Sequence, residues 1–196
     1  PSTIELGRSF VSLPYQSTRM GAKSLFALDN LWDGLGALTV LNPAMKYFYG
    51  KVTMYQDYDP HARNLILYFL DKHFPDAEHL VRPTHPLPIV VDEAEVAQLF
   101  PTDDLQTNYR TLSQTVRAMG FNIPPLVNAY MALSPKLRVF GTAINPGFGA
   151  VQETGILIAI EEIIPSKRVR HIETFELDKV QSELLWTNIS RRVRLV

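Results

Sequence analysis

The chain has 196 residues, which is enough for one domain with a substantial core. Hydrophobic residues make up 46% and charged residues 20%, as is typical of globular proteins. The formal net charge of −1 excludes a protein whose main task is to hold phosphate backbones, because that task requires a basic excess. The chain has no cysteine, which excludes disulfides, thiolate catalysis and cysteine-bound zinc.

The sequence predicts a protein of the cytoplasm. No apolar run reaches the roughly 18 residues that a membrane span requires, and no segment has the pattern of a signal peptide. The lack of cysteine fits a reducing compartment. We therefore expect any membrane contact to be peripheral, at the inner membrane.

The first elements along the chain are a strand and a helix. Residues 4–11 alternate between two faces, which predicts a strand, and Gly7 within it indicates a bulge. Spacings of three and four predict a helix that ends near Asn42. Its expected apolar stripe is Leu25, Leu28, Trp32, Leu35 and Thr39, widened by Leu31 and Leu38. Trp32 is expected in the core, whereas Gly34 and Gly36 indicate close packing against a strand or a donor chain.

A second strand and helix follow. Residues 46–55 are rich in aromatic and β-branched types, which favour a strand. Asp59 is the expected N-cap of a helix with Pro60 at its first position, and this helix ends before Pro75. Its expected apolar stripe is Ala62, Leu65, Ile66, Phe69 and Leu70.

For the middle of the chain, the sequence predicts an irregular segment followed by three helices. Residues 74–91 are rich in proline and therefore form no regular element. Asp92 caps a short helix that ends near Phe100, and Thr102 caps the next helix, which stops at Gly120. The third of these helices covers residues 124–133.

The last predicted elements are two strands and a basic tail. Strands over residues 137–144 and 155–164 flank a glycine-rich turn at residues 145–149. Residues 165–196 contain seven Lys or Arg and four Asp or Glu, so we divide the chain into a domain of residues 1–164 and a basic extension. A solvated charged tail is the expected role of this extension, with contact to anionic lipid or acidic acyl carrier protein as the alternative.

The five histidines do not predict a metal site. They stand at positions 61, 73, 79, 85 and 171, without the spacing of metal ligands. We therefore expect each of them at the surface or in a loop.

The loop after the first strand is suited to an anion, because it leads into a helix whose N-terminal N–H groups point outward. Residues 16–21 of this loop read QSTRMG. They resemble the Gln/Arg-x-x-Gly-x-Gly/Ala pattern of the GNAT superfamily, with Arg19 in place of the first glycine. In that superfamily the corresponding strand, loop and helix bind the pyrophosphate or phosphopantetheine of an acyl donor. An arginine at this position still supplies positive charge to a phosphate.

Further segments extend this resemblance over about residues 4–164. Residues 5–8 (ELGR) resemble the Glu-x-x-Arg strand of acyl-homoserine-lactone synthases and of the bacterial ornithine-lipid and glycine-lipid N-acyltransferases, often labelled hemolysin-like. More of the second group's pattern recurs in order at residues 31–36 (LWDGLG), 47–50 (YFYG), 57–60 (DYDP), 123–126 (IPPL), 129–130 (AY) and 145–149 (NPGFG).

The resemblance implies a GNAT-like α+β fold with a mixed sheet flanked by helices. It also implies transfer of a fatty acyl group from acyl carrier protein, or from acyl-CoA, to the amine of a small amino acid such as glycine or ornithine in aminolipid synthesis. Acyl-phosphopantetheine is then the co-substrate. The residues expected to bind it are Phe10, Val11, Gln16, Arg19, Gly21 and Ala22.

Amide formation explains why the first strand is the expected catalytic element. The attacking ammonium must lose a proton, and the thioester oxygen must be stabilised as it becomes anionic. Glu5 is the expected base, directly or through water; the alternative is a structural carboxylate paired with a cation. Arg8 either holds the carboxylate of the amino acid or pairs with Glu5, which requires a bulge at Gly7. The expected oxyanion donor is a backbone N–H within residues 9–11.

Two other functions remain open at this point, an acyl-homoserine-lactone-like synthase and a non-catalytic module that packs on a partner. In the GNAT fold the strand with Glu5 is the fourth of about seven, whereas here it lies at residues 4–11. We therefore expect its neighbour to come from a missing N-terminal half, another polypeptide or a second copy of the chain. The isolated chain is expected to lack transferase activity or to act only as a homo-oligomer.

Overall fold

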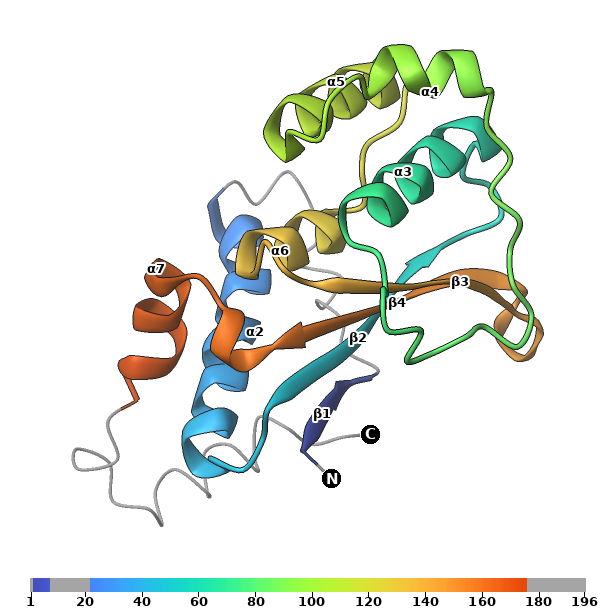
Figure 1. Ribbon diagram of the computed structural model, residues 1–196. Coiled ribbons are helices and arrows are strands. Elements are labelled where there is room, and N and C mark those ends of the chain that lie inside the picture. The colour runs from blue at the N-terminus through green and yellow to red at the C-terminus, as the bar shows by residue number, and fades with distance from the viewer. Residues whose placement is uncertain (1, 8–21, 176–196) are drawn as a thin grey trace.

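Four strands form one mixed sheet in the computed structural model, which describes residues 2–7 and 22–175 and, within residues 22–30, the backbone alone (Figure 1). The strands are β1 (Thr3–Leu6), β2 (Tyr47–Met54), β3 (Arg138–Asn145) and β4 (Val151–Ala159), in the order β1-β2-β4-β3. β1 is parallel to β2, whereas β4 is antiparallel to both of its neighbours.

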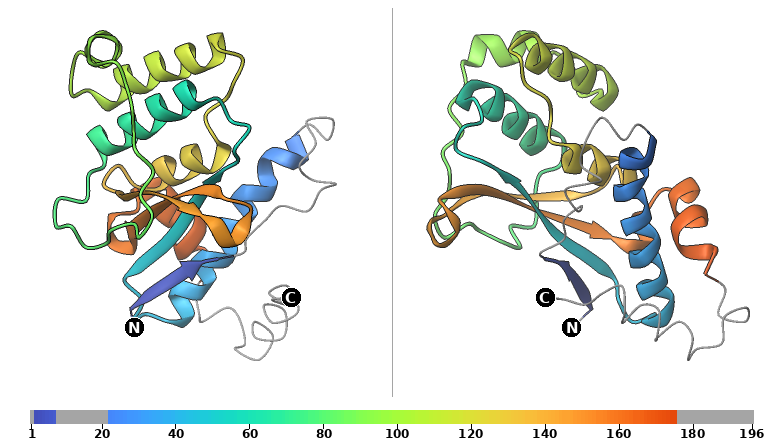
Figure 2. Two further views of the ribbon diagram at one scale, coloured as in Figure 1. Left: turned by 90° about the vertical axis from the view of Figure 1, so that its right-hand side faces the viewer. Right: turned by 180° about the vertical axis from the view of Figure 1, so that it is seen from behind.

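Helices flank the sheet. Those of the described residues are α2 (Ala22–Leu41), α3 (Pro60–His73), α4 (Glu93–Leu99), α5 (Leu105–Ala118), α6 (Pro125–Leu133) and α7 (Pro165–Arg168). Figures 1 and 2 show α3, α5 and α6 on one side of the sheet, with α5 farthest from it. The expected α+β fold with a mixed sheet flanked by helices is therefore confirmed. In the part of the chain that is described, no helix has the length and apolarity to cross a membrane.

The alternation along β2 separates two faces of the sheet. Phe48, Val52 and Met54 are buried among the helices on what we call the covered face. The intervening residues Tyr49 and Lys51 lie on the opposite side, which we call the open face. The buried cluster on the covered face combines residues of most helices and strands, including Leu65, Ile66 and Phe69 of α3, Val127 and Leu133 of α6, Ile156 and Ile158 of β4, and Trp32 of α2. The core position expected for Trp32 is confirmed.

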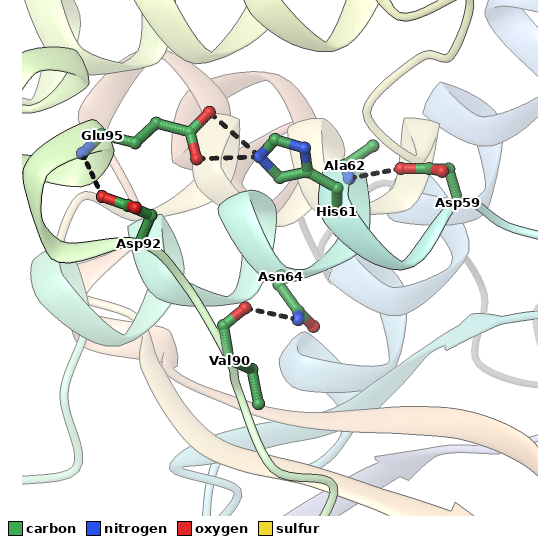
Figure 3. A network of polar contacts seen from close by, with 7 residues as sticks. All are labelled: Asp59, His61, Ala62, Asn64, Val90, Asp92 and Glu95. Atoms are coloured by element: carbon green, nitrogen blue, oxygen red, sulfur yellow. Dashed lines mark hydrogen bonds and ion pairs between the residues drawn. The ribbon is translucent and has the colours of Figure 1, made fainter.

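The α3 helix begins as predicted and holds the segment that follows it. The Asp59 carboxylate accepts a hydrogen bond from the Ala62 N–H at 2.8 Å, and Pro60 occupies the first helical position. All five residues of the expected stripe are buried. Figure 3 shows how polar side chains of α3 reach the next elements: Asn64 donates to the Val90 carbonyl at 2.7 Å, and His61 lies 2.9 Å from Glu95 of α4.

Two predicted boundaries are wrong. The N-cap of α5 is Asp104 rather than Thr102, because the Asp104 carboxylate accepts from the Thr107 N–H at 2.7 Å. The last strand covers Val151–Ala159 rather than residues 155–164. Gly149 and Ala150 both have positive φ, so the chain reverses its direction within these two residues. The β4 strand therefore starts earlier in the sequence than predicted. It also ends earlier, because a 3-10 turn at Ile160–Glu162 follows it.

The chain after residue 164 packs on α2 over the residues that are described. A π-helical turn, Val169–Glu173, follows α7 and lies against α2. His171 is only 3% exposed, and its Nδ1 atom lies 2.6 Å from Asp33 of α2. The expectation that every histidine lies at the surface or in a loop is therefore wrong for His171. The domain boundary at residue 164 stays a prediction.

Candidate active site at the β1–β2 pair

Of the residues expected at the active site, Glu5 is the one whose surroundings the structure describes. It lies on β1 opposite Tyr49 of β2, and its side chain is exposed. A Cβ atom at Gly7 would lie 3.5 Å from a Glu5 carboxylate oxygen, so this glycine leaves the carboxylate uncovered along the strand. Arg8, Phe10, Val11, Gln16, Arg19 and Gly21 lie outside the described residues, and Ala22 is the first residue of α2. Their predicted roles and the predicted bulge stay predictions.

Polar and aromatic side chains from three strands surround Tyr49 on the open face. Lys51 donates to Glu153 of β4 at 3.1 Å, and Asn145 donates to the same carboxylate oxygen at 3.0 Å. The Tyr49 ring stacks on Phe140 of β3, with 6.2 Å between the ring centroids. The Glu153 side chain is 16% exposed, whereas that of Lys51 is 40% exposed. The ammonium group of Lys51 is therefore accessible even though it is part of an ion pair.

The surroundings of Tyr49 change the pKa of its hydroxyl group. Burial is the main reason why the pKa of the Tyr49 hydroxyl lies above its usual value. Lys51 lowers this pKa, whereas the carboxylates Glu5 and Glu153 raise it. The Tyr49 hydroxyl therefore stays protonated at neutral pH, and it can donate a hydrogen bond to an anionic group on the open face.

A second tyrosine lies against the same strand pair from the covered face. The Tyr130 hydroxyl lies against Gly50, where a Cβ atom would overlap with it. Gly50 in turn pairs with Leu6, the last residue of β1. Tyr130 is 3% exposed and its ring meets Trp32 edge-on at 5.7 Å. Burial raises the pKa of Tyr130 to about 12, so the hydroxyl remains a neutral donor.

The β1–β2 pair thus carries complementary groups on its two faces. Glu5 offers a carboxylate on the open face, and Tyr130 offers a neutral hydroxyl on the covered face. A carboxylate can accept a proton from an attacking ammonium, and a neutral hydroxyl can donate to an oxygen that becomes anionic. Amide formation from an amine and a thioester needs both roles at one carbon, and because the sheet separates the two groups, Glu5 is the one of them that faces a ligand on the open face.

Sequence reasoning did not select Tyr49, Lys51 or Tyr130 as site residues. Two signals were available: Tyr49 and Lys51 alternate on one face of a predicted strand, next to the face of Glu5, and Gly50 marks a position where another group approaches the strand closely. The identity of that group, Tyr130 of α6, required the tertiary structure because 80 residues separate the two positions.

A cavity of about 490 Å³ lies at the N-terminal end of β2. Its lining includes Met45, Lys46, Ile160 and Arg168. The Arg168 guanidinium is already engaged with the Ile160 carbonyl at 3.3 Å. Glu5, the predicted active-site residue whose side chain the structure describes, does not line this cavity.

The sequence of this chain is similar to those of known proteins. Over 175 residues, or 89% of the chain, the sequence is 62% identical to a glycine N(alpha)-acyltransferase of Phocaeicola vulgatus and to another of Bacteroides thetaiotaomicron. The matched residues make up 54% and 52% of these two proteins. No family model and no solved structure matches the chain. The chain is therefore a relative of proteins named glycine N(alpha)-acyltransferase and spans about half the length of the curated relatives it matches.

Proposed function

We propose that this chain acts in an N-acyltransferase, which transfers a fatty acyl group from acyl carrier protein or acyl-CoA to the amine of glycine or another small amino acid. The observation that carries the proposal is the 62% identity to two proteins named glycine N(alpha)-acyltransferase. The finer parts of the proposal are the donor, the GNAT-type phosphopantetheine loop around Gln16 and a role in aminolipid synthesis. They rest on the sequence resemblance.

The geometry of the β1–β2 pair supports a mechanism for this transfer. Glu5 accepts a proton from the ammonium group, and the free amine then attacks the thioester carbonyl. The C–N bond forms, and a backbone N–H within residues 9–11 donates a hydrogen bond to the carbonyl oxygen as it becomes anionic. The C–S bond then breaks, and the nitrogen gives up its second proton to the departing thiolate. A neutral amide and a thiol result, and Glu5 returns its own proton to solvent.

The test is a transfer assay with radiolabelled glycine and long-chain acyl donors, on the wild-type chain and on Glu5→Gln. Loss of the base should lower kcat by roughly 10²- to 10⁴-fold, because a glutamine amide cannot accept the proton. The exposed position of Glu5 predicts an unchanged urea midpoint for the variant.

Two outcomes would count against this proposal. Unchanged kcat in Glu5→Gln would remove Glu5 from the mechanism. Failure to acylate any amine with either donor, both at every oligomeric state of the chain and when the chain is combined with the polypeptide that completes its sheet, would overturn the proposed function.

A further inference from the structure

The open face beside Glu5 carries a second charged group that the mechanism above does not use. Lys51 stands two residues after Tyr49 on β2, so that the Cα atoms of these two residues are about 7 Å apart. Tyr49 is itself the register partner of Glu5. A negative and a positive side chain therefore flank Tyr49 on the same face of two neighbouring strands.

The contacts of Lys51 leave part of its binding capacity available. An ammonium group has three N–H donors, and among the described side chains Lys51 donates to Glu153 alone. Glu153 divides its acceptor capacity between Lys51 and Asn145. With 40% of its side chain exposed, Lys51 can form further charge-assisted hydrogen bonds to an anion that approaches the open face.

The Tyr49 ring is turned toward β3 and β4. It stacks on Phe140 of β3. It can do so because the residue opposite Lys51 is Gly155, whose Cβ would lie 3.3 Å from the Tyr49 hydroxyl oxygen. The ring therefore leans away from β1 and does not cover the exposed Glu5 side chain.

We propose that Lys51 binds the carboxylate of the amino-acid acceptor, with the Tyr49 hydroxyl as a second donor, while the ammonium group of the acceptor faces Glu5. This inference rests on the proposed function and names the acceptor site of that reaction. An α-amino acid carries its two charges one carbon apart, and the site places opposite charges on the two sides of Tyr49. The arrangement selects a zwitterion over a simple amine and aligns its nitrogen with the base.

The test compares glycine with glycinamide, which has the amine but lacks the carboxylate. For each variant the ratio of kcat/KM for the two acceptors is measured, so that the intrinsic reactivity of the two amines cancels between variants. We expect Lys51→Met to lower the preference for glycine by roughly 10- to 100-fold, mainly through KM, and Lys51→Arg to retain most of it. The matched control is Lys136→Met, which removes another exposed lysine that forms an ion pair, here with Glu162 at 3.8 Å. The control should leave the ratio unchanged.

A retained preference in Lys51→Met overturns the inference. If Arg8→Gln loses the preference instead, Arg8 holds the carboxylate, as the sequence resemblance allows. Where the wild-type chain acylates neither amine, also as an oligomer and with the polypeptide that completes its sheet, the proposed function fails and the acceptor site is decided by binding. Glycine added to the isotopically labelled chain should then shift the amide signals of Tyr49 and Gly155 in the wild type but not in Lys51→Met. The absence of such shifts in the wild type overturns the acceptor site as well.

Discussion

His73, at the C-terminal end of α3, is held in its neutral form by a contact that bridges two helices. Its Nε2 atom lies 3.0 Å from the side-chain nitrogen of Asn108 in α5, which is fully buried. An amide nitrogen donates, so the ring nitrogen must accept and carry no proton. Burial is the main reason why the pKa of His73 lies below its usual value of 6.5; Lys72 lowers it further, whereas Asp103 and Asp104 oppose the shift.

We expect this contact to make stability depend on pH. Because the folded pKa of His73 is depressed, its contribution is fully present above pH 6.5 and is lost as the pH falls through the folded pKa, since the unfolded chain then binds more protons. The urea midpoint of the wild type should therefore fall between about pH 7.5 and about pH 5.5. His73→Gln should show a smaller decrease, whereas His85→Gln, in an exposed loop, should behave as the wild type. An identical decrease in His73→Gln and the wild type would show that another group is responsible.

At the scale of single elements, two glycines of α2 have different surroundings despite their similar sequence context. A Cβ at Gly36 would overlap with the backbone carbonyl of His171, whereas a Cβ at Gly34 meets no described atom within 4 Å. The close approach that the sequence predicted is therefore present at Gly36, but its partner is the turn after α7 and not a strand or a donor chain.

This difference predicts opposite effects of one substitution. Gly34→Ala should stabilise the chain by about 1 kcal/mol, because alanine has the higher helix propensity. Gly36→Ala should destabilise it by about 1–3 kcal/mol, because the new methyl group forces the 169–173 turn away from α2. Urea unfolding of both variants measures the difference. Equal effects would mean that this turn does not pack on α2 in solution.

For some elements, local sequence information was sufficient to predict where the helix begins and which residues it buries. The cap, the first proline and the apolar stripe of α3 are all local signals, and the structure confirms each of them. The N-cap of α5 was assigned wrongly because Thr102, Asp103 and Asp104 are all good capping residues. The choice among them depends on where the backbone becomes helical, which packing decides.

At the scale of the whole molecule, β1 lies at one edge of the described sheet. Backbone groups on an open strand edge readily pair with another strand. We therefore expect the active species to be an oligomer or to contain a further polypeptide, and the isolated monomer to lack transferase activity. Sedimentation velocity combined with transfer assays of each separated species tests this prediction. Robust turnover by a strictly monomeric preparation would contradict it.

The sequence by itself determined helices α2 to α6 and most of the strands and proposed Glu5 as the base, because periodicity, caps and turn residues act over a few positions. Only the tertiary structure decided that β4 lies between β2 and β3, that Tyr130 lies against Gly50, and that His171 packs on α2 beside Asp33. These contacts join residues that are far apart in the chain, and no local pattern encodes them. The same holds for the candidate site. Glu5 could be identified from the sequence of its strand. Its neighbours Tyr49, Lys51 and Glu153 come together only in the tertiary structure, where three strands lie side by side.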